Sequence, residues 1–199
     1  MRQAIILVGA VLVLSISAAA QGPAGAGAHG SGARIPYAAG FEGSVWQLGV
    51  GYQYNRINLT GAPFNTQGLN TSITRFFNDW FALEGQVAGT FGNTGTTTVP
   101  ANLRAKSLFL GGGLRIAYRG HGRTEPWIHG VGGVQYFRFT QTAGVLGSNH
   151  ALEGEIGGGI DYHLNPRTAV RLEADALGSR FFSATQRHFQ IVTGLVFNF

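Results

Sequence analysis

Apolar and polar residues alternate with a period of two along much of the chain, most clearly in its last segment, residues 187–199. Successive side chains of a β-strand point to opposite faces, so this pattern predicts a strand and not a helix. One face of this strand is large and aromatic, with Phe189, Ile191, Leu195, Phe197 and Phe199. The chain ends on that face, which is unusual for an uncovered edge strand in water.

Seven further segments alternate in the same way. They predict strands at residues 44–55, 68–77, 80–92, 106–118, 126–139, 150–163 and 168–177. Residues 59–67, 92–105, 140–149 and 178–186 predict longer loops, and Asn78–Asp79, 119–125 and Asn165–Arg167 predict short turns. Strands of about 9–11 residues, joined by alternately long and short connections, are typical of bilayer-spanning barrels.

The predicted fold is therefore all-β: an eight-stranded antiparallel up-and-down transmembrane β-barrel at residues 44–199. In lipid a closed barrel pairs every backbone group, and its apolar outward faces need no further cover. Because the strand number is even, both ends of the barrel are expected on the periplasmic side. The longer loops are then extracellular.

The N-terminal region has a different composition. Residues 1–20 combine Arg2, an apolar run and the small residues Ala18–Ala20, which predicts a cleaved signal peptide. The apolar run is shorter than the ~20 residues of a helical membrane span. Residues 21–43 are rich in Gly and Ala and predict a flexible periplasmic leader. We therefore expect export to the outer membrane of a Gram-negative bacterium.

Composition and charge limit the classes of partner that the protein can be expected to bind. The chain has 32 glycines, no cysteine and a net charge of +5, with its basic residues scattered. This excludes disulfides and argues against nucleic-acid binding. Four basic residues near the predicted loops could meet lipopolysaccharide phosphates or simply be solvated: Arg56, Arg104, Lys106 and Arg180.

Charged residues gather on the inward faces of the predicted strands. The cluster comprises Glu84, Arg115, Glu153, Glu155, Asp161, Arg171, Glu173 and Asp175. An eight-stranded barrel is only wide enough for side chains to fill, so we expect a plugged, salt-bridged interior. A small cation-preferring pore with an acidic lumen is the alternative. A soluble ligand-carrying barrel would need an apolar interior, which this cluster contradicts.

No other pattern indicates chemistry. The glycine clusters at 111–113, 130–133 and 157–159 lie within strands and predict close packing, not phosphate loops. The histidines lack metal-binding spacing, although His129 and His163 could share the lumen with Asp161, which keeps a metal site open as an alternative. We therefore expect no catalytic residue, no metal and no cofactor.

Four segments carry a resemblance to a known family: LGVGYQYNR, NDWFALEGQV, RLEADALGSRFF and HFQIVTGLVFNF. With them, residues 44–199 resemble the transmembrane domain of the outer-membrane protein A superfamily. The closing strand is similar to the C-terminal signature that the barrel assembly machinery reads in such proteins. Larger members also carry a peptidoglycan-binding domain, which is not expected here because the chain ends at the barrel.

The resemblance implies a structural or surface-interaction protein of the cell envelope. Its implied partners are outer-membrane lipid, lipopolysaccharide and the assembly machinery, with no nucleic acid, and the protein is expected to be a monomer. Some eight-stranded barrels are lipid A deacylases with a Ser/His/Glu site. Here His188 is followed by Phe189 and Gln190 without a His-x-Ser pair, which makes a lipid-modifying enzyme the weaker alternative.

Overall fold

The computed structural model describes residues 45–59, 62–93, 104–120, 122–141, 144–181 and 184–199. The predicted signal peptide at 1–20 and leader at 21–43 lie outside the described residues. None of the described residues forms a helix long and apolar enough to cross a membrane.

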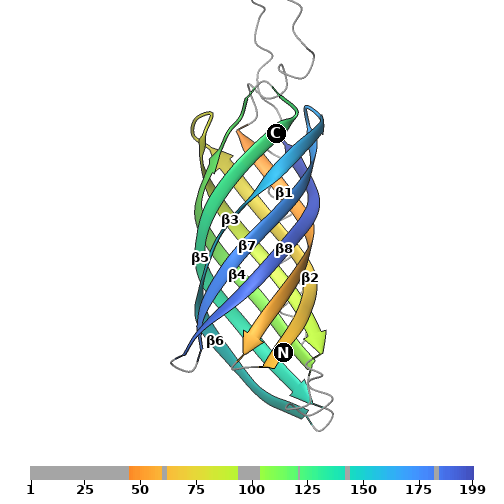
Figure 1. Ribbon diagram of the computed structural model, residues 1–199, viewed down its shortest axis with the longest axis vertical. Helices are drawn as coiled ribbons and strands as arrows, with labels where there is room; N and C mark the ends of the chain where they lie inside the picture. Colours follow the sequence, from red (N-terminus) through yellow and green to blue (C-terminus); the bar gives the residue numbers. More distant parts are fainter. Residues whose placement is uncertain (1–44, 60–61, 94–103, 121, 142–143, 182–183) are drawn as a thin grey trace, which may run out of the picture. The chain divides into compact units, whose positions relative to one another are not determined.

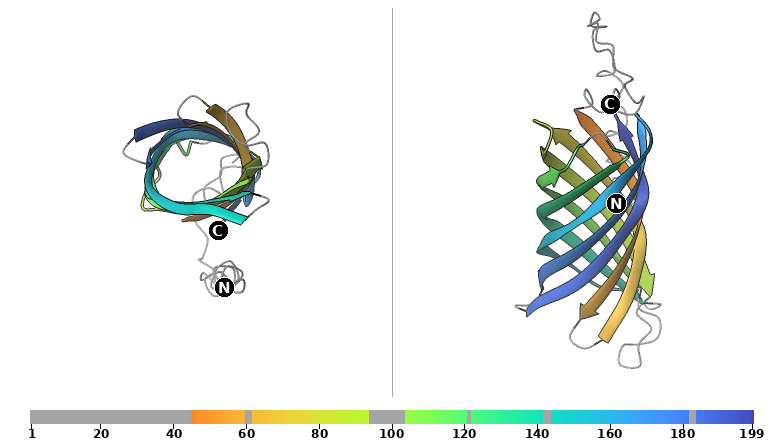
Figure 2. Two further views of the ribbon diagram at one scale, coloured as in Figure 1. Left: turned by 90° about the horizontal axis from the view of Figure 1, so that it is seen from below. Right: turned by 45° about the horizontal axis from the view of Figure 1, so that its top comes forward.

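Eight strands form one closed antiparallel barrel (Figures 1 and 2). They are β1 (Trp46–Leu59), β2 (Ala62–Phe76), β3 (Phe81–Asn93), β4 (Arg104–Ala117), β5 (Thr124–Gln141), β6 (Gly144–Asn165), β7 (Thr168–Phe181) and β8 (Ala184–Asn198). Each strand pairs with the next, and β8 closes the ring by pairing with β1. The predicted fold class is confirmed.

The alternation in the sequence is reproduced as alternating burial. In β3, for example, Ala82, Glu84 and Gln86 are buried inside the barrel, whereas Leu83 and Phe91 are exposed on its outer surface. Inward side chains do not face the lipid around the barrel, so they can be small, polar or charged. The predicted faces of the strands are thus confirmed.

Three of the predicted long loops were wrong. Residues 59–67, 140–149 and 178–186 mostly continue the strands, which run to within two residues of each other at each hairpin. The β1–β2 ladder, for instance, extends to the pair Leu59–Ala62. Gly, Pro and Asn there were taken as loop signals, but the strands keep pairing beyond the apolar belt. Most of the fourth predicted loop, residues 94–103, lies outside the described residues.

Two of the three short turns at the opposite end were predicted correctly, and the third, 119–125, was predicted too long, because Thr124 and Glu125 already belong to β5. The side-chain oxygen of Asn78 accepts hydrogen bonds from the backbone N–H groups of Trp80 (3.1 Å) and Phe81 (2.7 Å). Asn165 accepts one from the N–H of Arg167 at 2.9 Å. Such Asx turns reverse the chain within a few residues, as predicted.

Apolar clusters occupy both ends of the lumen. Near the β1–β2 and β5–β6 hairpins, Ile57, Phe64, Ala105, Phe137 and Ala151 pack together with Phe139. At the end with the short turns the cluster is Phe76, Ala82, Ala117 and Trp127. The interior is therefore not uniformly polar, contrary to the expectation. Apolar clusters, including a third of Ala88, Phe109 and Val131, lie among the charged groups.

Candidate functional site

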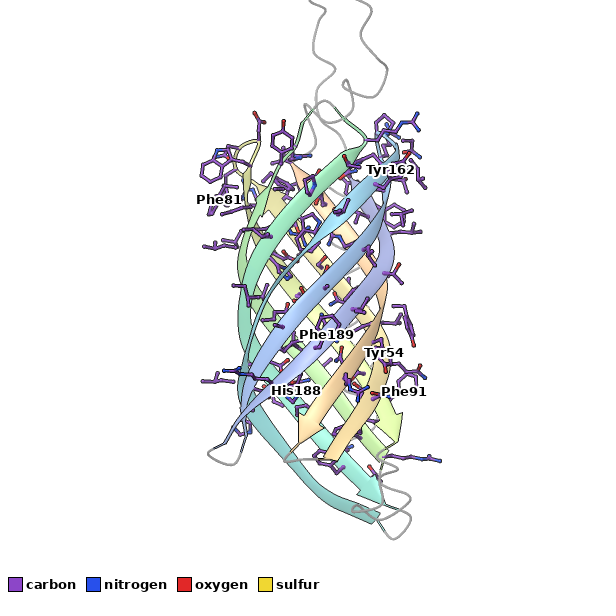
Figure 3. All side chains as sticks on the ribbon, in the orientation of Figure 1. Tyr54, Phe81, Phe91, Tyr162, His188 and Phe189 are labelled. Carbon is purple, nitrogen blue, oxygen red and sulfur yellow. The ribbon has the colours of Figure 1, made fainter. Side chains whose placement is uncertain are left out.

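The outer surface of the barrel is a broad apolar belt. Among its more exposed side chains are Leu69, Leu110, Ile128, Leu152, Ile156 and Leu172. Aromatic side chains flank this belt: Phe81 and Tyr162 lie toward the short turns, and Tyr54, Phe91 and Phe189 toward the other end (Figure 3). An apolar band between two girdles of aromatic side chains matches the hydrocarbon core of a bilayer and its two interfaces.

The terminal strand β8 contributes to the same belt. Phe189, Ile191, Leu195 and Phe199 are exposed on the outer face, and Phe197 is half-buried. Their strand pairs with β7 on one side and with β1 on the other, so it closes the barrel. The proposed assembly segment therefore presents its side chains outward, where another protein or lipid can contact them.

All eight residues of the predicted charge cluster are buried inside the lumen. Its centre is a bidentate pair in which Arg115 donates from Nε and Nη2 to Glu84, both at 2.7 Å. His129 joins Glu84 to Asp175, at 3.3 Å from Nδ1 and 2.9 Å from Nε2. Gln190 also donates to Asp175 at 3.0 Å. One hydrogen-bonded network thus crosses the lumen.

A second bidentate pair lies beside it. Arg171 donates to both oxygens of Asp161 at 2.8 and 2.7 Å, and to the hydroxyl of Ser72 at 3.2 Å. The guanidinium groups of Arg171 and Arg115 both lie over the ring of Trp127, at 4.8 and 3.8 Å from its centroid. Trp127 therefore makes cation–π contacts with both arginines and ties the two ion pairs together.

The sequence prediction missed a third group at the end with the short turns. Glu125, assigned to a turn, is the first inward residue of β5 and is 1% exposed. It accepts a hydrogen bond from Gln47 at 3.1 Å and lies 3.5 Å from both Arg119 and His163. If the strand had been predicted to begin at Thr124, Glu125 would have been assigned to the inward face, because it precedes His129 by four residues on the same strand.

The remaining three acidic residues of the cluster have few partners, and Glu173 lies a long 4.0 Å from Arg171. Gln135, with its amide nitrogen toward Glu153, donates to that carboxylate and accepts from Ser107. Glu155 lies one inward position further along β6, and its Oε1 has no hydrogen-bond partner among the described residues. The cluster is thus unequally satisfied. Both arginines make bidentate pairs, but Nη1 of Arg115 and Oε1 of Glu155 have no hydrogen-bond partner among the described residues.

A serine–histidine pair near the other end of the lumen also escaped sequence analysis. Ser179 on β7 and His188 on β8 are both buried, with Oγ 3.0 Å from Nε2. Glu153 lies opposite Ser179 in the β6–β7 ladder. The residue types resemble a catalytic triad, but their lumenal burial keeps the hydroxyl from lipid, which favours a structural hydrogen bond.

Whether Ser179 acts as a nucleophile or only forms a structural hydrogen bond can be tested directly. We expect a fluorophosphonate probe to leave Ser179 unlabelled in the folded protein, because a nucleophile must be reachable by its acyl substrate. Mass spectrometry of the treated protein measures the adduct, with Ser179→Ala as the blank. Stoichiometric labelling that His188→Gln abolishes would instead identify an activated serine.

A small pocket lies beside the charges. One void of about 10 Å³ lies against Arg171, Glu173, Asn70 and Ser72, which is room for roughly one water molecule. Together with the apolar clusters, the inward side chains pack against one another, as expected for a barrel of eight strands.

Comparison with known proteins supports the fold. No family model and no curated protein sequence matches the chain. The structure is similar to Neisserial surface protein A, with a TM-score of 0.64 and 9% identity over 78% of this chain and 98% of that one. It is also similar to Ail, the attachment invasion locus protein of Yersinia pestis, solved with the heparin analogue sucrose octasulfate: TM-score 0.53, 16% identity, 76% of this chain and 97% of that one. The expected resemblance to eight-stranded outer-membrane barrels is confirmed at the level of the fold.

Proposed function

We propose that this chain is an integral outer-membrane β-barrel with a structural or surface-interaction role in the Gram-negative cell envelope and no catalytic activity. The observation that carries the proposal is the arrangement of its two faces, with apolar side chains outside and paired charges inside. In water this arrangement would expose the apolar belt and bury charge, both at a cost in free energy. A lipid environment removes the first cost, and the ion pairs reduce the second.

The charged residues beyond the belt suggest lipopolysaccharide as a partner. Lys106 on β4 is exposed and pairs in register with exposed Arg138 on β5, and Arg104 is exposed on the same face of β4. Arg56 is exposed on β1, whereas nothing is described of the Arg180 side chain. Phosphate groups form charge-assisted hydrogen bonds with such cations. We place lipopolysaccharide at this surface, in a monomeric barrel inserted by the assembly machinery through β8.

Specific recognition is assigned to the hairpins at the end away from the short turns. There β5 and β6 are the longest strands, with 18 and 22 residues, and their hairpin projects beyond its neighbours (Figure 1). The Yersinia neighbour, the attachment invasion locus protein, was crystallised with the heparin analogue sucrose octasulfate. A surface contact of that general kind, made by the projecting hairpins, is the role proposed here.

The filled lumen predicts that the barrel does not conduct. We expect the purified protein to insert into planar bilayers and give no discrete single-channel currents, since side chains occupy the ion path. Co-flotation with liposomes checks insertion independently. Failure to insert would contradict a membrane barrel.

A matched variant separates the plugged barrel from the alternative pore. Cation-selective openings whose selectivity falls in Glu153→Gln would establish an acidic pore and overturn the structural role. Glu153 suits this control because its neutralisation leaves both arginine ion pairs intact. Silence in both proteins, with insertion shown, supports the plugged lumen.

A further inference from the structure

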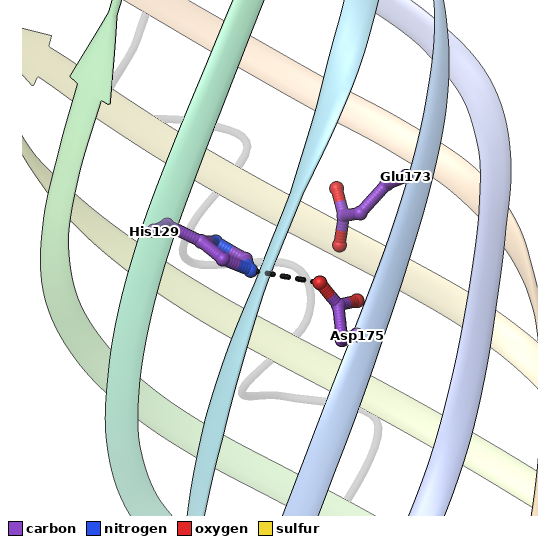
Figure 4. Close-up of side chains that lie close together, drawn as sticks. All are labelled: His129, Glu173 and Asp175. Carbon is purple, nitrogen blue, oxygen red and sulfur yellow. Dashed lines mark hydrogen bonds and ion pairs between the residues drawn. The ribbon is translucent and has the colours of Figure 1, made fainter.

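Three ligand-type side chains meet in the middle of the lumen. His129 of β5 and Glu173 and Asp175 of β7 each offer one nitrogen or oxygen atom, all within 4.8 Å of one another. Figure 4 shows the imidazole of His129 extending past β6 toward the two carboxylates. We propose that these residues, with Glu155 of β6 as a fourth ligand, bind one divalent transition-metal cation such as Zn²⁺.

Two inward-facing glycines on β6 allow His129 to approach the carboxylates of β7. Gly157 is in register with His129 on one side and with Asp175 on the other, and Gly159 is in register with Glu173. A Cβ atom at Gly157 would collide with the Asp175 carboxylate and with the Ala174 carbonyl oxygen. Because this position lacks a side chain, residues on β5 and β7 can reach each other across β6.

The charge balance of the lumen favours a cation here. Arg115 and Arg171 are each engaged by a bidentate partner, Glu84 and Asp161. Asp175 contacts His129 and Gln190, but Glu173 lies a long 4.0 Å from Arg171, and Oε1 of Glu155 has no hydrogen-bond partner among the described residues. Buried carboxylates without full compensation are costly, and a divalent cation would provide that compensation.

Glu155 supplies an independent indication of a ligand. Its side chain is buried, with the residue 5% exposed. Oε1 has no hydrogen-bond partner among the described residues. Glu155 is the inward residue of β6 next to Gly157, which is in register with both His129 and Asp175, so Glu155 is a lumenal neighbour of the site. A buried carboxylate oxygen left unpaired is destabilising, whereas a bound metal ion would satisfy it.

The histidine is already oriented as a metal ligand. Nδ1 lies 3.3 Å from Glu84, which Arg115 holds in place, and this contact leaves Nε2 directed at Asp175. Metal-bound histidines commonly donate their other N–H to a carboxylate in this way. Nε2 of His129 and Oδ1 of Asp175 are 2.9 Å apart, whereas two ligand atoms of a tetrahedral zinc ion are roughly 3.4 Å apart, so these two atoms must separate slightly when zinc binds.

Binding requires side-chain movements and the loss of one proton. The three ligand atoms lie within 4.8 Å of one another, so Glu173 must move closer, and Glu155, which is outside this group of three, must turn toward it. The cation takes the place of the proton between Nε2 and Asp175, and that proton is released to solvent. An imidazole with carboxylate oxygens suits zinc or manganese better than calcium or magnesium, which favour all-oxygen sites. The ion would join β5, β6 and β7, contrary to the sequence expectation of no metal site.

The test uses the purified protein without a histidine tag, refolded with Zn²⁺ or with EDTA. After removal of free ions, elemental analysis should find about one zinc per barrel. The zinc-loaded protein should unfold at a higher temperature than the EDTA-treated one. Less than about a tenth of an equivalent in correctly folded protein would overturn the proposal.

Variants locate the ion. His129→Gln and Asp175→Asn should weaken zinc binding at least about tenfold. Glu153→Gln changes another buried carboxylate of β6, which is not one of the proposed ligands, and this variant should retain zinc binding. Retention in both ligand variants, or equal loss in Glu153→Gln, would overturn the site. Should the ligand variants fail to fold, X-ray absorption of the zinc-loaded protein decides: imidazole coordination supports the site, and all-oxygen coordination refutes it.

Discussion

Replacing Arg115 with methionine is expected to lower the free energy of unfolding by about 3–5 kcal/mol. Arg115 is fully buried and donates two hydrogen bonds to Glu84, and its guanidinium lies over Trp127. The substitution keeps an apolar stem of similar length but leaves the Glu84 carboxylate buried without its cation. Urea unfolding of the barrel in lipid vesicles, followed by tryptophan fluorescence, measures the loss.

Two controls identify the cause. In the double variant Glu84→Gln/Arg115→Met no charge is stranded, so more than half of the lost stability should return. Arg138→Met removes an exposed arginine from the neighbouring strand and should change stability by no more than about 0.5 kcal/mol. A loss below about 1 kcal/mol for Arg115→Met would mean that water or another cation reaches Glu84.

Adding a single methyl group at Gly157 is expected to cost about 3 kcal/mol, at the upper end of the usual overpacking range. The new Cβ of Gly157→Ala would overlap the Asp175 carboxylate and the backbone of β7. A backbone atom cannot move aside as the end of a flexible side chain can. The β6–β7 ladder and the His129–Asp175 contact should therefore both be disturbed. The same unfolding experiment measures the effect.

The matched control lies on the same strand. Gly154 faces outward, and a Cβ there would meet nothing closer than 3.9 Å. Gly154→Ala should therefore leave stability unchanged or slightly raised, since it lowers the conformational entropy of the unfolded chain. Similar losses at both positions would show that strand flexibility, and not lumenal space, explains the glycines of β6.

The direction of each side chain was predictable from local pattern. Successive residues of a strand alternate between faces whatever their partners are, so Leu83 and Glu84 could be assigned to opposite sides without knowledge of the register. The same rule placed the charged residues in the lumen and the aromatic residues of β8 on the outer surface. Errors arose where the predicted strands were too short, so that Glu125 was assigned to a turn and three hairpins were assigned to loops.

Strand length was not predictable in this way. Gly, Pro and Asn in residues 59–67 and 140–149 are turn-forming by themselves. In the barrel, backbone pairing with a neighbouring strand outweighs this local preference. Apolar inward residues such as Ile57, Phe64 and Phe137 then pack inside the extended wall. That packing depends on residues distant in sequence, so the local composition did not reveal it.

The sequence by itself determined the fold class, the order of the strands and the face on which each residue lies, because these follow from a period of two repeated along the chain. Only the tertiary structure decided which buried charges meet. Arg115 pairs with Glu84, 31 residues away, and His129 reaches Asp175, 46 residues away and two strands along the barrel. Such contacts depend on the stagger between neighbouring strands and on the gap left by Gly157, and neither is encoded in the alternation of any single strand.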